Sequence, residues 1–524
     1  MPSGYLALLL HAHLPFVRHP EHEEFLEETW LFEAITETYI PLLQTMERLA
    51  HDGVCFKLAM SITPPLCAML QDEHLQTRYQ RHLERSIELA QREIERNRDA
   101  AGVQELARFN FDTLTETRRQ WEEWNRDLLG AFRRVRDAGL LQIIASAATH
   151  GVLPLLAESP EAVRAQVLSG CDAYRETFGV DPVGFWLPEC AYAPGLEEVL
   201  QEANIRWFVL DAHGLILAKP QPRHAIYRPC FTPAGPAAFA RDPDSSRQVW
   251  SAEFGYPGDP VYRDFYRDVG FDFPPATVFP HSCLQTPRFT GLKYHRITGA
   301  GRNKEIYNRK WAVNAAAAHA DHFLAARRRQ IEDVRASTPE PILLMPFDAE
   351  LFGHWWYEGP VFLERFIRQA SLHSSELAMT TPSEYLRNQS THEIVQPAAS
   401  SWGEGGHLGV WLHESNAWIY PHLHVAAQRM TEMARANAQA SSARTERALK
   451  QLARELLLAQ ASDWAFLIKT GTAKHYAAER TTDHIARFNR LYEQVKTAAI
   501  DTEFLSDCES RDNLFPNLRW RYYL

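Results

Sequence analysis

The sequence predicts an α/β protein, a distorted (β/α)7 barrel with an inserted domain and a C-terminal α-helical domain. Over the first 400 residues, short apolar runs of strand length alternate with longer stretches of helical periodicity. This alternation is typical of parallel strands joined by helices. Polar side chains directly follow several of the apolar runs, and barrel enzymes carry their catalytic groups at the ends of their strands.

Seven apolar runs are predicted to be strands, at residues 5–10, 54–61, 141–148, 183–187, 206–211, 341–350 and 377–380. Amphipathic stretches between them predict helices at residues 27–49, 72–138, 161–178, 195–204, 303–336 and 360–373. From about residue 421 the pattern is helical to the end of the chain.

Changes in composition predict the domain boundaries. Residues 1–400 form the catalytic barrel, which is interrupted at about 217–300 by a segment rich in Gly, Pro, Asp, Tyr and Arg. Because so long an irregular segment is usually functional, we expect this insertion to build or cover the active site. Residues 401–524 form the C-terminal helical domain.

The composition favours a cytoplasmic enzyme. A net charge of −11 argues against nucleic acid or an anionic membrane as a partner. The seven cysteines are scattered, and their odd number fits a reduced, intracellular compartment. The run 5–10 is too short for a signal peptide, and no run reaches membrane-spanning length.

Two carboxylates from separate strand ends suggest chemistry on glycosides. Glu189 follows the run 183–187 between two aromatic residues, and Asp348 lies at the tip of the run 341–350. In such a pair, one carboxylate attacks the anomeric carbon, and the other protonates the leaving oxygen and then activates the acceptor. Taken alone, Glu189 is equally well explained as a cap of the helix that follows it.

Histidines at two further strand ends leave room for other classes of protein. His11, His13 and His150 could hydrogen-bond sugar hydroxyls or steady the nucleophile, or serve as structural contacts. Together with Asp348 they also resemble a zinc-ligand set, which would indicate a metal-dependent polysaccharide deacetylase and leave Glu189 without a role. A glucan-binding or scaffold protein fits the 14 tryptophans but does not explain acids at strand ends.

Four stretches carry a resemblance to a known family. They are His11-Ala-His13-Leu-Pro15, Ala148-Thr149-His150-Gly151, Trp186-Leu187-Pro188-Glu189-Cys190-Ala191-Tyr192 and Pro346-Phe347-Asp348-Ala349-Glu350-Leu351-Phe352-Gly353-His354-Trp355-Trp356. In sequence and in order they resemble the conserved regions of glycoside hydrolase family 57, in its subgroup of 1,4-α-glucan branching enzymes. The resemblance implies a (β/α)7 barrel, an inserted domain and a C-terminal helical domain that completes the cleft.

The resemblance also implies roles for individual residues. Glu189 corresponds to the nucleophile and Asp348 to the general acid/base, and neither a metal nor an organic cofactor is required. The residues expected to contact the substrate are His11, His13, Trp30, His150, Trp186, Arg263, Trp355, Trp402, Trp411 and Asp463. Trp411 is also explained as a core aromatic residue between the helical domain and the barrel.

The segment 232–246 is expected to form a mobile loop over the site, with an aromatic residue at its tip. This chain has Phe239 there but no tyrosine, and the departure leaves the ratio of transfer to hydrolysis open. The resemblance implies a retaining enzyme of glycogen synthesis, which cleaves an internal α-1,4 bond of amylose, amylopectin or glycogen and forms an α-1,6 branch. An α-glucan hydrolase and a 4-α-glucanotransferase remain alternatives for the same site.

Overall fold

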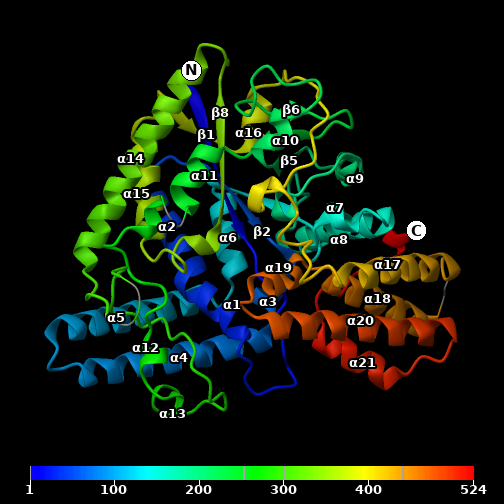
Figure 1. Cartoon of the computed structure of the whole chain (residues 1–524), viewed down its shortest axis with the longest axis horizontal. Helices are drawn as coiled ribbons and strands as arrows, with labels where there is room; N and C mark the ends of the chain where they lie inside the picture. The colour runs from blue at the N-terminus through cyan, green and yellow to red at the C-terminus, as the bar shows by residue number, and fades with distance from the viewer. Residues whose placement is uncertain (1, 252–253, 300, 302, 440–441) are drawn as a thin grey trace.

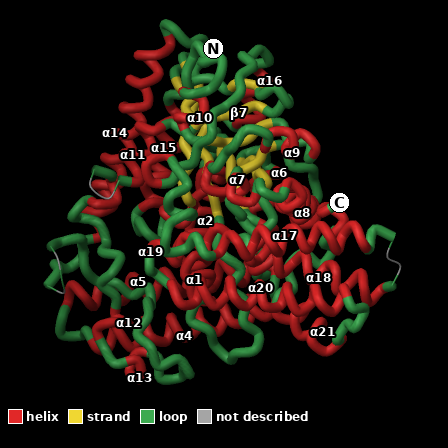
Figure 2. The backbone as a smooth tube through the Cα atoms, turned by 45° about the vertical axis from the view of Figure 1, so that its right-hand side comes forward, coloured by secondary structure: helices red, strands yellow, loops and turns green. Residues whose placement is uncertain are grey.

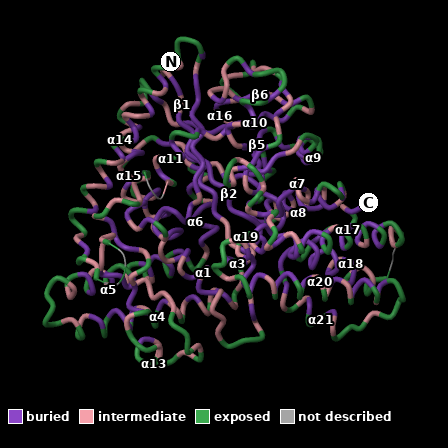
Figure 3. Tube along the Cα trace, in the orientation of Figure 1, coloured by how far each residue is buried: buried purple, intermediate pink, exposed green. Residues whose placement is uncertain are grey.

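The computed structural model of the chain describes residues 2–251, 254–299, 301, 303–439 and 442–524. Figure 1 shows the strands in the upper part of the molecule, the long helices α4 (Glu73–Arg96) and α5 (Ala101–Glu123) at lower left, and the last helices of the chain at lower right. Figure 2 shows helices around the strands. Figure 3 shows the central strands buried, whereas α4 and α5 alternate between buried and exposed positions.

The strands are β1 (Gly4–Ala12), β2 (Leu58–Ile62), β3 (Leu141–Ser146), β4 (Gly184–Trp186), β5 (Trp207–Leu210), β6 (Cys230–Phe231), β7 (Ala237–Ala240), β8 (Ile342–Asp348) and β9 (Leu377–Met379). Neighbours on the path β7-β5-β4-β3-β2-β1-β8 pair in parallel, and β6 pairs antiparallel with β7. The path closes between β7 and β8, where Arg241 and Leu344 form a parallel bridge and the Asp242 N–H donates to the Leu344 carbonyl at 2.8 Å.

The ring of the distorted barrel therefore consists, in the described part of the chain, of β1 to β5, β7 and β8. The prediction was wrong about the last member of this ring. β7 lies within the range 217–300 that was expected to be an insertion. The predicted strand 377–380 is β9, which lies off the ring and, among the described strands, pairs with Gly4–Leu6 of β1. The strand β7 reads Ala-Ala-Phe-Ala, which lacks the β-branched residues that signal a strand.

A small apolar cluster fills the interior of the ring. It is formed by Ala7, Leu9, Ala59, Ile144, Trp186, Cys190, Trp207, Val209, Ala237, Phe239, Ile342, Leu344 and Tyr385. Phe239 is only 1% exposed, and its ring centroid lies 5.7 Å from that of Trp207. The expectation that Phe239 stands at the tip of a mobile loop is therefore wrong, because β5 and β7 pair and alternate residues of β7 point inward.

The helices before residue 400 are α1 (Glu28–Ala34), α2 (Ile40–His51), α3 (Pro64–Gln71), α4, α5, α6 (Leu128–Asp137), α7 (Leu153–Leu156), α8 (Pro160–Phe178), α9 (Leu196–Glu202), α10 (Ala212–Ile216), α11 (Pro243–Trp250), α12 (Val269–Asp272), α13 (Pro275–Val278), α14 (Arg309–Arg335), α15 (Gly359–Leu372) and α16 (Pro382–Asn388). Short 3-10 turns are η2 (Pro188–Cys190), η3 (Tyr256–Gly258), η4 (Ala349–Leu351), η5 (Glu404–Gly406) and η6 (Trp520–Tyr523). Of the described helices, none is long and apolar enough to cross a membrane.

α4 illustrates how the sequence forms these helices. Asp72 caps its first turn by accepting a hydrogen bond from the Leu75 N–H at 3.0 Å. Tyr79, Leu83 and Ile87 then recur every four residues and are buried, so one face of the helix packs and the other is left to charged residues.

The helix that follows β1 contains a π-helical turn, η1 (Ile35–Tyr39), between α1 and α2. This turn packs against the segment that follows β8. Gly353 has φ +119°, and a Cβ atom there would lie 1.8 Å from the Glu37 carbonyl oxygen. The Glu37 carboxylate accepts a hydrogen bond from His354, and the Tyr39 hydroxyl donates to Glu350. π-helical turns often lie at functional sites, and this one braces the end of β8.

The C-terminal helices are α17 (Ile419–Ala436), α18 (Ala443–Ala459), α19 (Ser462–Thr470), α20 (Lys474–Lys496) and α21 (Thr502–Arg511). They contact the barrel directly. Gly151 and Ala461 form an antiparallel bridge, and the Ser462 N–H donates to the His150 carbonyl at 3.1 Å. This contact places the first turn of α19 against the carboxyl ends of the barrel strands.

Candidate active site

The two predicted carboxylates stand at the carboxyl ends of barrel strands. Asp348 is the last residue of β8 and is in register with His11 of β1. Glu189 lies in the short turn after β4 with φ +61°, and Cys190 and His150 also have left-handed backbones, with φ +47° and +59°. Non-glycine residues in this region are strained, and such strain is concentrated at functional sites.

Both oxygens of the Glu189 carboxylate accept hydrogen bonds from the segment beyond residue 400. The Trp402 indole N–H donates to Oε2 at 2.8 Å, and the Ser462 hydroxyl donates to Oε1 at 2.9 Å. The backbone N–H of Trp402 also donates a hydrogen bond to the Glu189 backbone carbonyl at 3.0 Å. The C-terminal part of the chain therefore fixes the orientation of Glu189.

The surroundings separate the acid strengths of the two carboxyl groups. Burial raises the pKa of Glu189 to about 7, although the hydrogen bonds from Trp402 and Ser462 oppose the rise. Burial raises the pKa of Asp348 well above its usual range, and the charges of Glu350 and Glu189 add to the effect. The surroundings therefore favour the protonated form of Asp348, while the hydrogen bonds from Trp402 and Ser462 favour the ionised form of Glu189. This is the division of roles that acid–base chemistry needs.

The three predicted histidines form one stacked group beside Glu189. The rings of His13 and His150 stack with centroids 3.9 Å apart, and Nε2 of His11 lies 3.0 Å from Nε2 of His150. His13 donates through Nε2 to the Asp463 carboxylate at 3.1 Å. Burial lowers the pKa of His11 and His150 well below the usual range. Burial acts in the same direction on His13 and is the largest single influence there. The charge and hydrogen bond of Asp463, together with the charges of Glu189 and Glu350, outweigh it and raise the pKa of His13.

This arrangement fits a hydrogen-bond network better than a zinc site. Both ring nitrogens of His13 have partners, since Nδ1 lies 2.9 Å from the Thr63 hydroxyl. Nδ1 of His150 lies 2.8 Å from the Ser462 hydroxyl, and its other nitrogen meets His11. Imidazoles that ligate one ion direct one nitrogen each at the same point. Here Nε2 of His11 and both ring nitrogens of His13 and His150 pair with each other or with neighbouring side chains, and only Nδ1 of His11 has no partner among the described residues.

One further cluster in the described residues has the composition of a metal site. The ligand atoms of Glu455, His484 and Asp512 all lie within 4.8 Å of one another and are buried. However, His484 donates to Glu455 at 2.7 Å, Arg480 donates to His484 at 3.0 Å, and Arg487 donates to Asp512 at 2.9 Å. The guanidinium groups supply the positive charge, so we interpret this cluster as an ion-pair network that joins α18, α20 and the chain after α21.

The structure divides the predicted tryptophans into two groups. Trp355 is 58% exposed, Trp30 is partly buried beside Tyr476, and Trp402 is partly buried against Glu189. Trp186 and Trp411 are 0% and 2% exposed, so neither ring is accessible to a substrate. Trp186 instead supports the ring of His11, 4.4 Å away, and Trp411 takes the core position that was the alternative explanation for it.

Arg263 lies in the segment between β7 and α14, and its side chain contacts residues other than the two predicted carboxylates. Its guanidinium stacks over the Tyr357 ring at 3.5 Å, donates to the Gly291 carbonyl at 3.3 Å and lies 3.8 Å from the Glu37 carboxylate. The side chain is buried, so it connects this segment to the π-helical turn. Asp463, in contrast, lies at the site through its contact with His13.

The structure adds residues that the sequence prediction did not include. Glu350 accepts from the His13 N–H at 3.2 Å and from the Tyr39 hydroxyl, and its charge acts on Asp348. The positive charge of Arg241, the residue after β7, partly opposes the rise in the pKa of Asp348. Glu350 could have been found from its strand-end position. Ser462 begins a helix 273 residues after Glu189, and no local pattern indicates that the two meet.

The fold and the site define an enzyme that acts on glycosidic bonds, because two carboxyl groups in unlike surroundings stand at the strand ends of a barrel and interact through their charges. The comparisons specify the family. Residues 7–397 match the model of glycosyl hydrolase family 57, and residues 422–523 match that of the C-terminal region of 1,4-alpha-glucan branching enzymes. The chain belongs to glycosyl hydrolase family 57, and the predicted family and fold class are confirmed.

Similar proteins carry two different activities in their names. The chain is 35% identical to a 1,4-alpha-glucan branching enzyme of Thermococcus kodakarensis, over 98% of this chain and 77% of that protein. The alpha-amylase AmyC from Thermotoga maritima has a TM-score of 0.92 and 42% identity, and covers 99% of both chains. A branching enzyme from Pyrococcus horikoshii has a TM-score of 0.90 and 34% identity, over 100% of this chain and 97% of that one.

Proposed function

We propose that the protein is a retaining 1,4-α-glucan branching enzyme. The observation that carries the proposal is that the segment matching the branching-enzyme C-terminal model, residues 422–523, supplies Ser462 and Asp463 to the site. The matched segment thus includes two side chains that contact Glu189 and His13. The substrate is an α-glucan such as amylose, amylopectin or glycogen.

The mechanism has two steps. Asp348 donates its proton to the oxygen of an internal α-1,4 bond while the Glu189 carboxylate attacks the anomeric carbon, which gives a covalent β-glycosyl intermediate. Asp348, now ionised, removes the proton from the 6-hydroxyl of an acceptor chain, whose oxygen displaces Glu189 and forms an α-1,6 branch. Two inversions give net retention. Trp402 and Ser462 hold the attacking carboxylate in place.

A second candidate function is α-glucan hydrolysis, which the similarity to AmyC favours. Both reactions share the first step, and they differ only in whether water or a sugar hydroxyl resolves the intermediate. Transfer prevails when the acceptor chain excludes water. A 4-α-glucanotransferase would use a 4-hydroxyl in place of the 6-hydroxyl on the same site.

The proposal assigns the enzyme to glycogen synthesis in the cytoplasm. Support for the compartment comes from the cysteines, all seven of which carry free thiols in the structure, as is usual for proteins of reduced compartments. The net charge of −11 fits a neutral polysaccharide partner better than a polyanion.

The test is incubation with amylose followed by counting two products. Side chains that isoamylase releases measure branches, and new reducing ends measure hydrolysis. A branching enzyme gives more branches than reducing ends, and Glu189→Gln gives neither. An excess of reducing ends would favour the hydrolase, and new linear chains without branches would favour the glucanotransferase.

A further inference from the structure

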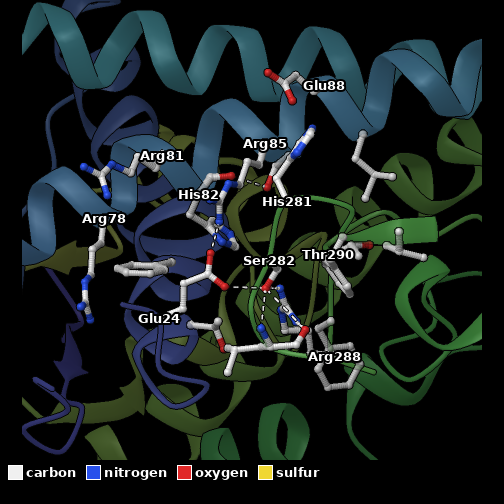
Figure 4. A pocket seen from close by; sticks show the side chains of 18 of the residues that line it. Glu24, Arg78, Arg81, His82, Arg85, Glu88, His281, Ser282, Arg288 and Thr290 are labelled. Atoms are coloured by element: carbon white, nitrogen blue, oxygen red, sulfur yellow. Dashed lines mark hydrogen bonds and ion pairs between the residues drawn. The ribbon is translucent and has the colours of Figure 1, made fainter. Parts of the chain in front are cut away.

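A pocket lies away from the catalytic carboxylates, between three segments of the chain. Its walls are residues 23–32, one face of α4 and residues 278–290. Figure 4 shows charged side chains from α4 facing the segment that carries Ser282 and Arg288. None of these residues takes part in the chemistry proposed above.

The charges that line the pocket are nearly balanced. Five arginines and four glutamates line it, namely Arg78, Arg81, Arg85, Arg92, Arg288, Glu23, Glu24, Glu28 and Glu88. Two arginine–glutamate pairs are already formed, Arg78 with Glu28 and Arg85 with Glu24. An anionic ligand would meet carboxylates as well as guanidiniums, so this balance does not favour phosphate or a nucleotide.

The walls are held in place by hydrogen bonds within the protein. Glu24 accepts from the Ser282 hydroxyl and from Arg85, and although burial opposes its charge, these bonds lower its pKa to about 2. Arg288 donates to the Leu284 carbonyl at 3.0 Å and to the Ser282 hydroxyl at 2.8 Å. A ligand would therefore find donors and acceptors that are already oriented, which lowers the entropy cost of binding.

The pocket combines these polar groups with aromatic faces. Phe25, Phe32, Phe279 and Phe289 line it together with His82. Burial and the nearby Arg288 and Arg85 charges lower the pKa of His82 to about 4, so its ring is neutral near pH 7. Sugars present apolar ring faces and hydroxyls that both donate and accept, and a balanced polar lining with aromatic rings suits such a neutral polyol.

A line of aromatic rings joins this pocket to the segment after β8. Phe289 lies 5.2 Å from Phe265 by ring centroids, and Phe265 stacks on the exposed Trp355 at 5.8 Å and 12°. Trp355 follows Asp348 by seven residues. A glucan chain bound against the exposed ring of Trp355 would therefore have further aromatic rings beside it in the direction of the pocket.

We propose that this pocket is a second glucan-binding site, which holds a remote part of the polysaccharide while its reacting segment occupies the catalytic cleft. The proposal rests on the proposed function for its ligand class. Its effect is on affinity for long or branched glucans, and short chains that occupy only the cleft do not depend on it.

The test measures binding of glycogen and of maltoheptaose to the full-length protein in a Glu189→Gln background, which prevents turnover. Arg81 and His281 have exposed side chains at the pocket, and we substitute both with alanine. We expect the affinity for glycogen to fall by about tenfold, the effect of losing roughly one hydrogen bond to a charged group. The affinity for maltoheptaose should stay within about twofold.

Two further variants make the result interpretable. Ser86→Phe fills the pocket from α4 without removing a charge, and it should weaken glycogen binding in the same way. The matched control is Arg108→Ala with His51→Ala, two exposed residues outside the pocket, which should leave both affinities unchanged.

Two outcomes would overturn the proposal. One is unchanged glycogen affinity in both pocket variants. The other is binding of inorganic phosphate to the parent protein that the pocket variants lose, which would identify an anion site. Branching of amylose is measured separately on the wild-type protein. Absence of branching there would sink the proposed function, while the binding results would still decide whether the pocket holds glucan.

Discussion

The charge on Glu189 is set by opposing influences on one carboxyl group. Burial raises its pKa to about 7, and two hydrogen bonds from neutral donors, Trp402 and Ser462, lower it. Attack on the anomeric carbon needs the ionised form, and protonation of the leaving oxygen needs the neutral form of Asp348. The rate should therefore rise with pH through about 7 and fall again when Asp348 loses its proton.

Trp402→Phe keeps an aromatic ring and removes the N–H donor. Because that hydrogen bond favours the charged form of Glu189, its loss should raise the pKa and move the acid limb of kcat/KM up by about one pH unit. Ser462→Ala should move the limb in the same direction. Trp418→Phe, an exposed tryptophan outside the site, is the control. A limb that stays in place in both variants would contradict the assignment of this limb to Glu189.

The two carboxylates should respond differently to the choice of substrate. Asp348→Asn removes the proton donor, and activity on amylose should fall by roughly a factor of 10²–10⁴ or more, the usual contribution of acid–base catalysis. An aryl maltoside with a good leaving group needs no such proton, so Asp348→Asn should still release the aryl group in a burst. Glu189→Gln should show no burst, because no covalent intermediate forms. A burst in Glu189→Gln would exclude it as the nucleophile.

At the scale of secondary-structure elements, the contact between the π-helical turn and the end of β8 requires a glycine. Gly353 has φ +119°, and a Cβ there would lie 1.8 Å from the Glu37 carbonyl oxygen. Gly353→Ala should therefore lower the free energy of unfolding by on the order of 3 kcal/mol, seen as a lower melting temperature. Gly409→Ala is the control, since a Cβ at Gly409 meets no atom within 4 Å. If Gly353→Ala melted at the same temperature as the wild-type protein, the π-helical turn could make room for the Cβ atom with little loss of stability.

The sequence predicted those elements that have strong local signals. The runs that became β1 to β5 and β8 are apolar and are followed by polar residues, so their type and their functional end could both be inferred. β7 has only alanines around Phe239, and it is a strand because β5 lies beside it. β9 has the apolar pattern of a barrel strand but pairs with only the first residues of β1. In both cases the place of the strand in the sheet depends on the strand beside it, and the pattern of a single sequence does not show which strands pair.

The same limit applies to the site. Glu189, Asp348 and the histidines were predicted because each follows a strand, and barrel geometry brings strand ends together. Trp186 was expected to face the substrate, but its side chain belongs to the apolar cluster that fills the interior of the ring. Ser462 was not predicted, because its role depends on how the C-terminal helices dock on the barrel.

At the scale of the whole molecule, this docking brings Ser462 to Glu189 and Asp463 to His13, so it completes the proposed site. Asp463→Asn removes the charge that raises the pKa of His13, and it should lower kcat on amylose by about tenfold while KM changes little. Asp483→Asn, at an exposed position on α20, is the control. An unchanged kcat in Asp463→Asn would indicate that His13 needs no ionic partner.

The position of Ser462 late in the chain has a consequence for biosynthesis. Synthesis proceeds from the N-terminus, so Glu189 and Asp348 leave the ribosome well before Ser462 and Asp463. During that interval Glu189 lacks the hydrogen bond from Ser462 that favours its charge. Under the proposed mechanism, the site around Glu189 is therefore completed only after the last helices of the chain have emerged and docked.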